Sequence, residues 1–149
     1  MPDILHRISI DAPRDRVHDL VTTTEGIGRW WSGRPAEGDP SVGGSFSVFF
    51  VDSDTATATF TLDSSTPAEV VWRVTDGPES WIGTAITFDL RPAGDTSTTL
   101  LFTHSDWAET SEFMHGCSTN WGAYLTSLKT GAEGAGFHPF PEGEISRWG

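Results

Sequence analysis

The sequence predicts an α+β domain in which a curved antiparallel sheet wraps around one long helix near the C-terminus. The helix is indicated by residues 112–130, where Phe113, Cys117, Trp121 and Tyr124 recur at intervals of three or four. Most of the chain before it consists of short runs that alternate between apolar and polar residues, the pattern of antiparallel strands. A sheet of about six strands curves as it twists, and the helix would cover its concave face.

The N-terminal part of the chain is predicted to form one strand and then two short helices. A period-two alternation indicates the strand. Asp11 is the expected N-cap of the first helix, Pro13 suits its first turn, and Thr23 or Thr24 would cap the second helix. The expected bounds are residues 3–10 for the strand, 14–22 and 24–31 for the helices, and 32–44 for a loop rich in Gly, Pro and Ser.

Five further strands are expected between this loop and the long helix. Thr fills many of their outward positions, as on the solvated face of a sheet. The turns between them are short, so neighbouring strands should pair antiparallel. The expected bounds are residues 45–51, 56–62, 69–75, 82–90 and 98–105.

The long helix has recognisable ends and two costly positions. Ser111 is its expected N-cap, with Thr110 as the alternative, and Gly131 begins the glycine-rich stretch that should end it. Gly116 and Gly122 each lower the stability of the helix by about 1 kcal/mol relative to Ala. We therefore expect them to serve a purpose there, which is to permit a close backbone approach or a bend. The tail, residues 137–149, is expected to be irregular, and residues 1–149 to form a single domain.

Composition excludes several classes of partner. The net charge of −12 over 149 residues disfavours nucleic acid and anionic membrane surfaces. No apolar run is long enough to span a membrane, and the N-terminus lacks the pattern of a signal peptide. The single Cys117 cannot form an internal disulfide, which fits a reducing compartment. We therefore expect a cytoplasmic protein, in which Trp148 docks on the domain or on a second subunit of a homodimer.

No residue pattern indicates a metal or a cofactor, and we expect neither. The five His show no H-E-x-x-H spacing, and His115 and Cys117 point apart because they are two residues apart on a helix. Phosphate-binding and dinucleotide-binding glycine motifs are missing. Cys117 lies on the apolar face of the helix, where desolvation disfavours the thiolate that a nucleophile requires. We expect it to be a small buried side chain.

His104 is the candidate for acid–base chemistry. It falls on the inward phase of the last predicted strand, and Asp106 follows two residues later on the same face. Such a pair could act as acid, base or ligand handle, because the pKa of a histidine lies near neutrality. The alternative is a hydrogen-bonded pair at the end of a strand.

Aromatic side chains dominate the inward positions. Nine Phe and seven Trp are many for a chain of this length, and they would form either the wall of a binding cavity or a packed core. We predict ligand binding by Trp30, Phe46, Phe60, Trp72, Trp81, Phe88, Phe102, His104, Trp107, Phe113, Cys117, Trp121 and Tyr124.

Six segments in a fixed order carry a resemblance that covers nearly the whole chain. They are DAPRDRVHDLVTT, IGRWWSG, VGGSFSV, VVWRVTD, TTLLFTHSDW and NWGAYLTSLKTGAEGAGFHP. With the order of the elements, they resemble the START-like superfamily, also called the SRPBCC, helix-grip or birch-pollen-allergen-like fold. Within it, the chain is similar to the branch of the activator of heat-shock protein 90 ATPase homologues.

The resemblance implies an apolar cavity between the sheet and the helix, but it does not imply a single activity. Some members bind lipids or other apolar ligands, some are cyclases or dehydratases of polyketide-like substrates, and one branch stimulates a chaperone. We expect a non-catalytic binding protein for an apolar or aromatic small molecule. The alternatives are a module that modulates a chaperone ATPase and a cyclase or dehydratase that uses His104 with Asp106.

Overall fold

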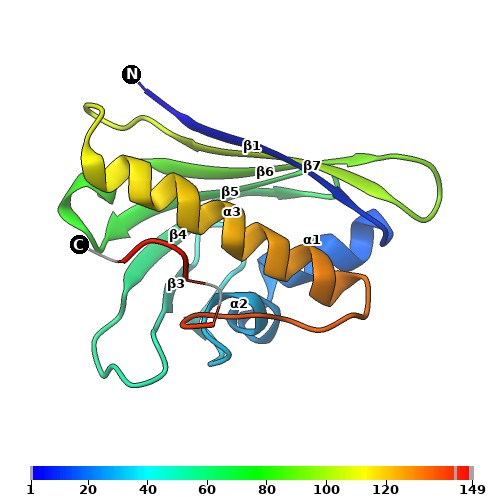
Figure 1. The fold of residues 1–149 in the computed structure, drawn as a ribbon, viewed down its shortest axis with the longest axis horizontal. Coiled ribbons are helices and arrows are strands. Elements are labelled where there is room, and N and C mark those ends of the chain that lie inside the picture. Colours follow the sequence, from blue (N-terminus) through cyan, green and yellow to red (C-terminus); the bar gives the residue numbers. More distant parts are fainter. Residues whose placement is uncertain (1, 143, 148–149) are drawn as a thin grey trace.

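One antiparallel sheet forms a layer of the molecule, and a long helix crosses its inner face (Figure 1). The computed structural model describes residues 2–142 and 144–147. Alternating apolar residues give the strands one buried side, which faces the helix. The strands are β1 (Ile4–Ile10), β2 (Glu37–Gly38), β3 (Ser45–Val48), β4 (Ala58–Thr66), β5 (Glu69–Asp76), β6 (Ala85–Pro92) and β7 (Thr98–Ser105).

Two short helices lie at one end of the molecule, beneath the C-terminal half of the long helix (Figure 1). The Thr23 hydroxyl accepts a hydrogen bond from the Gly26 N–H at 3.0 Å and caps the second short helix. Ser111 caps the long helix in the same way, through the Met114 N–H at 3.1 Å. Both predicted caps are confirmed. The helices are α1 (Arg14–Thr22), α2 (Thr24–Trp31), the 3-10 turn η1 (Glu79–Trp81) and α3 (Glu112–Ala132).

The predicted α+β class, with a curved antiparallel sheet around a long C-terminal helix, is confirmed, but the strand count is corrected from about six to seven. The strands lie in the order β1-β7-β6-β5-β4-β3-β2. The additional strand, β2, falls inside the segment predicted to be a loop. It forms because Glu37 and Gly38 pair with Ser47 and Phe46 of β3. Two residues are too few to show a period, so the sequence pattern could not reveal this strand.

Two local predictions are also corrected. Strand β4 continues to Thr66, through residues predicted to turn, because the irregularity between Leu62 and Ser64 lets it keep pairing with β5. Asp11 does not cap α1. The N-cap position belongs to Pro13, whose carbonyl accepts the first helical hydrogen bonds, and the Asp11 carboxylate accepts one from the Ser97 hydroxyl instead.

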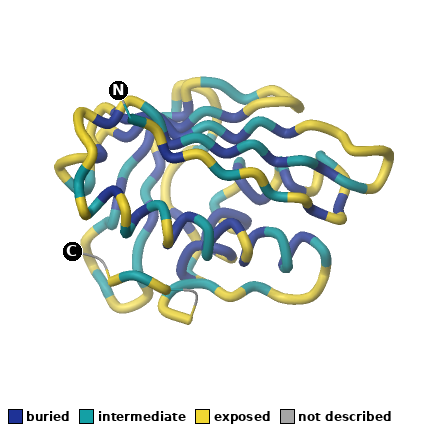
Figure 2. Tube along the Cα trace, turned by 45° about the horizontal axis from the view of Figure 1, so that its top comes forward, coloured by how far each residue is buried: buried dark blue, intermediate teal, exposed yellow. Residues whose placement is uncertain are grey.

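The core fills the space between the sheet and the helices. Figure 2 shows the buried residues on the facing sides of these two layers, and the exposed residues gathered in the loops. On β7 the alternation is complete, with Thr98, Leu100, Phe102 and His104 buried and the residues between them partly exposed. The long helix buries Trp121 and its apolar neighbours against this face. The predicted site residues therefore come from the region between the two layers.

The described part of the C-terminal tail runs back along α3 and is tied to it by polar contacts (Figure 1). The His138 N–H donates to the Ser127 hydroxyl at 2.7 Å. Near the middle of the helix, the Asn120 side-chain amide donates to the Ser146 carbonyl and accepts from the Ile145 and Ser146 N–H groups. The tail forms no helix or strand within residues 137–142 and 144–147. Trp148, which was predicted to dock, lies outside the described residues.

Candidate functional site

The predicted ligand-binding residues come together between the sheet and α3, and they divide into two groups. All but one are buried, with exposed fractions of at most 4%. Phe113 is the exception and is half-buried. The first group, which we call the closed end, contains Trp30, Phe46, Phe60, Trp72 and Phe88. The second group, which we call the open end, contains Trp81, His104, Trp107, Phe113, Cys117 and Trp121. Phe102 and Tyr124 lie between the two, each in contact with Trp121.

Direct ring packing fills the closed end. Trp72 contacts Phe60 and Phe88 at centroid distances of 5.1 and 4.8 Å, and it stacks on Trp30 at 6.1 Å. Both indole N–H groups are satisfied by the end of α1. Trp30 donates to the Leu20 carbonyl at 2.8 Å, and Trp72 donates to the Val21 carbonyl at 3.2 Å. These side chains therefore join the two short helices to the sheet as an ordinary core does.

His104 is held inside the open end by a chain of hydrogen bonds. Its Nδ1 accepts from the Trp121 indole at 3.1 Å, which places the ring proton on Nε2. Nε2 lies 2.8 Å from the Thr84 hydroxyl, which donates in turn to the Trp81 carbonyl. Burial lowers the pKa of His104 to about 3. The imidazole is therefore neutral at physiological pH, and both of its nitrogens are engaged.

The predicted partnership of His104 with Asp106 does not form among the described residues. Asp106 is exposed, and its backbone turns away with φ of 72°. Its N–H donates to the Asp3 carboxylate at 3.2 Å. Strand β7 ends at Ser105. The alternation of side chains along a strand, which predicted that His104 and Asp106 share one face, therefore does not extend to Asp106. His104 as held has no free lone pair with which to abstract a proton.

The open end reaches the surface at a hollow of about 670 Å³. The β5–β6 connection contributes one side of this hollow, and the β7–α3 connection contributes the other. Trp107 is only 1% exposed, and its indole N–H has no hydrogen-bond partner among the described residues. A second hollow, of about 170 Å³, shares Phe113 with the first and reaches Cys117. The first hollow is lined by Pro78, Glu79, Ser80, Trp107, Ala108, Glu109, Ser111 and Phe113.

Cys117 is a protonated thiol in this setting. Burial raises the pKa of Cys117 to about 11, and a hydrogen bond with Trp81 offsets only part of that rise. A nucleophilic role would need the opposite shift. Cys117 can therefore contribute a small, soft surface to a ligand site.

Three buried polar residues around the site escaped the sequence analysis. Thr84 supports His104, while Asn120 and Ser127 hold the C-terminal tail. For two of them, the spacing along the sequence indicates a position next to the buried face of α3. Asn120 lies three residues after Cys117, and Ser127 lies three after Tyr124, so both fall beside the apolar stripe of α3.

No group of three or more His, Cys, Asp and Glu residues within the described ranges could hold a metal ion. No helix in the described part of the chain is long and apolar enough to cross a membrane.

Comparison with known proteins identifies the family. The model of the Activator of Hsp90 ATPase homolog 1-like protein family matches residues 11–133. The chain belongs to this family. One solved structure, described as the Aha1 dimer from Colwellia psychrerythraea, is 34% identical, with a TM-score of 0.78 over 91% of this chain and 98% of the other. Comparison with curated proteins gave no match.

Two more distant structures share the fold of this family member. CalU16 from Micromonospora echinospora is 24% identical, with a TM-score of 0.70 over 95% of this chain and 71% of the other. PFC0360w, an HSP90 activator from Plasmodium falciparum, is 20% identical, with a TM-score of 0.70 over 86% and 94%. At these identities the likeness shows the fold alone, so function must be argued from the site.

Proposed function

We propose that the protein binds a small apolar or aromatic molecule at the open end of its aromatic interior. The observation that carries this proposal is the Trp107 indole, which borders the hollow and is buried without a hydrogen-bond partner among the described residues. A buried donor that is left unsatisfied costs about 1–3 kcal/mol. The nitrogen itself is covered, so a ligand must enter beside the Trp107 ring to reach it. A ligand that does so and offers an acceptor to this N–H recovers that cost, so the site favours a molecule with a carbonyl or ether oxygen.

The surroundings of Trp107 define the rest of the ligand. The hollow of about 670 Å³ falls within the size range of small-molecule sites. Phe113 is half-buried and lines both this hollow and the smaller one, so its ring offers a stacking surface to a planar ligand. Affinity would come chiefly from burial, at about 25 cal/mol per Å² of apolar surface. The protonated Cys117 thiol and the fully engaged His104 support binding without chemistry.

The test compares 1-acetonaphthone, which carries a carbonyl acceptor, with 1-ethylnaphthalene, which carries none. Trp107→Phe keeps an aromatic ring and removes the N–H. Native mass spectrometry and calorimetry should show up to about tenfold weaker binding of the ketone to this variant, and unchanged binding of the hydrocarbon. Phe49→Leu, whose ring contacts the Arg34 guanidinium and does not line this hollow, is the control and should bind both compounds normally. Equal losses for the two compounds, or no binding of either to the unmodified protein at millimolar concentration, would refute the proposal.

A second candidate function, modulation of a chaperone ATPase, is supported by family membership and by the 34% identity to the Aha1 dimer. In this function the partner would be a cytoplasmic heat-shock protein 90, and the active form would be a homodimer. The test is the ATPase rate of a purified chaperone of that class with and without the protein, combined with light scattering for the oligomeric state. An unchanged rate at saturating protein would eliminate this candidate.

A further inference from the structure

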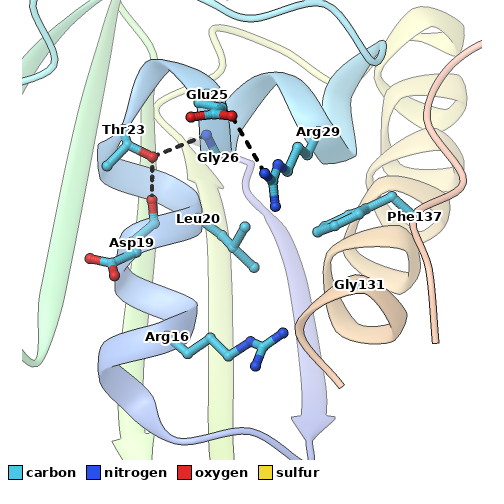
Figure 3. A pocket seen from close by; sticks show the side chains of 9 residues that line it. All are labelled: Arg16, Asp19, Leu20, Thr23, Glu25, Gly26, Arg29, Gly131 and Phe137. Atoms are coloured by element: carbon cyan, nitrogen blue, oxygen red, sulfur yellow. Dashed lines mark hydrogen bonds and ion pairs between the residues drawn. The ribbon is translucent and has the colours of Figure 1, made fainter. Parts of the chain in front are cut away.

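Another hollow, of about 540 Å³, lies beside the C-terminal end of α3 (Figure 3). Trp107 precedes the opposite end of this helix. It forms where α1 and α2 meet the end of α3 and the start of the C-terminal tail. None of the predicted ligand-binding residues lines it. Its lining consists of Arg16, Asp19, Leu20, Thr23, Glu25, Gly26, Arg29, Gly131 and Phe137.

Two guanidinium groups point into this hollow from different helices. Arg16 comes from α1 and Arg29 from α2, and both side chains extend toward the space in front of Leu20 (Figure 3). Arg16 has no hydrogen-bonded or ionic side-chain partner among the described residues. Arg29 has only Glu25, at 3.4 Å, and both partners are more than half exposed. Exposed pairs of this kind are weak, so a bound carboxylate can replace Glu25.

The remaining wall of the hollow is apolar and fixed in place. Leu20 is buried behind the two arginines, and the half-buried Phe137 ring faces them from the C-terminal tail (Figure 3). The ring lies over Gly131, where a Cβ atom would overlap it. The next residue, His138, is anchored by its N–H to the Ser127 hydroxyl. Phe137 is therefore a preformed surface against which a ligand can pack.

The charges of the lining favour a single negative charge on the ligand. Asp19 and Glu25 formally balance Arg16 and Arg29, and the whole chain carries −12. The Asp19 carboxylate points away from the two guanidinium groups (Figure 3). Thr23 is already engaged with the Gly26 N–H and the Asp19 carbonyl. A multiply charged phosphate would meet strong repulsion from the acidic chain, whereas a carboxylate fits two planar guanidinium forks.

We propose that this hollow is a second binding site, for an aromatic or branched aliphatic carboxylate. The carboxylate lies between Arg16 and Arg29, and the apolar part of the ligand packs between Leu20 and Phe137. The site is independent of the open end and shares no lining residue with it.

The test uses 1-naphthoate and its neutral analogue 1-naphthalenemethanol, with calorimetry for affinity and amide chemical shifts for location. Arg16→Gln and Arg29→Gln should each weaken naphthoate binding about tenfold. The alcohol should bind all forms equally weakly. Arg7→Gln removes the same charge from the exposed side of β1 and is the matched control, which should change naphthoate affinity less than twofold.

The outcomes separate this site from the one at Trp107. Naphthoate should shift the amides of Leu20, Gly26 and Gly131, and Trp107→Phe should leave that binding unchanged. Three results would overturn the proposal. The first is an equal loss of naphthoate affinity in Arg7→Gln and in the two site variants. The second is binding of the alcohol as tight as that of naphthoate. The third is no binding of naphthoate at 10 mM.

Discussion

His104 is a histidine that the fold keeps uncharged. The Trp121 indole occupies its Nδ1, and no charged side chain is among its hydrogen-bond partners. Burial lowers its pKa to about 3. In the unfolded chain the same ring would titrate near 6.5. Between these two values the unfolded state therefore binds a proton that the native state does not.

This difference predicts that stability falls as the pH is lowered from 6.5 toward 3. The unfolded state binds more protons in that window, so the free energy of unfolding rises with pH across it. Because the native pKa of His104 is about 3, this residue should lower the free energy of unfolding by about 2 kcal/mol at pH 5 relative to pH 7.5. Urea unfolding at the two pH values measures the loss. In His104→Asn, which cannot titrate, the pH dependence should shrink by that amount, and an unchanged dependence would contradict the neutral assignment.

At the residue scale, side-chain phase was predictable but hydrogen-bond partners were not. The period of α3 placed Cys117, Trp121 and Tyr124 inward, and all three are buried. Nothing in the sequence linked His104 to Thr84, because that contact depends on the register in which β6 pairs with β7. The nearest carboxylate in sequence is that of Asp106, but the hydrogen bond of this residue is made by its backbone N–H, which donates to the Asp3 carboxylate.

The long helix contains glycines that serve different purposes. At Gly122 an added Cβ would lie 3.7 Å from the His6 ring, which is an ordinary contact. At Gly116 it would meet only the Ser146 side chain of the C-terminal tail. At Gly131 it would overlap the Phe137 ring. The close approach expected at Gly116 therefore involves the tail, and the position with the tightest packing is Gly131, which was predicted only to end the helix.

These surroundings predict opposite effects of the same substitution in one helix. Gly122→Ala should stabilise the protein by about 0.5–1 kcal/mol, because Ala lowers the cost of forming the helix and meets no obstacle. Gly131→Ala should destabilise it by about 1–3 kcal/mol, because the new methyl group displaces Phe137. Denaturant unfolding of the two variants checks the pair. Effects of the same sign would mean that Phe137 does not pack on Gly131.

At the element scale, long periodic segments were predicted accurately and irregular joints were not. Helices α1 and α2 and strand β7 have the expected bounds. Strand β4 departs from them, because its pairing with β5 overrides the local preference of Ser for turns. Strand β6 begins at Ala85 and not at residue 82, because the turn η1 comes just before it. The two-residue strand β2 exists only because β3 lies beside it. Such features depend on which residues are neighbours in the folded structure, and a single sequence does not reveal those neighbours.

The charge of the whole molecule has a measurable cost. With a net charge of −12, like charges repel across a small surface, and they are drawn closer together when the chain folds. Raising NaCl from about 10 to 150 mM shortens the screening length to about 8 Å. The thermal midpoint should therefore rise with salt. In the double variant Asp52→Asn, Asp54→Asn, which alters two exposed residues, the rise should be smaller. A midpoint that is constant or falls with salt would contradict this expectation.

The overall architecture followed from the order of the elements, but the form of the interior did not. An aromatic inward set is compatible with a cavity or with a packed core, because both need apolar residues at the same positions. The structure distinguishes them locally. Trp72 is surrounded by other rings, while Trp107 borders a hollow. That difference arises from the loops after β5 and β7, whose shape has no periodic signature.

The packing of the indole rings also gives the protein an intrinsic spectroscopic signal of its side-chain packing. Trp72, Trp30, Trp121 and Trp81 form a continuous series with centroid distances of 6.0–6.5 Å, and Trp31 joins it through Trp121. Excitation absorbed by one ring can migrate along such a series, and coupled rings held in fixed orientations give strong near-ultraviolet circular dichroism. That signal is lost when side-chain packing loosens, even while helices and strands persist. One spectrum thus distinguishes the native interior from an expanded state, without any added label.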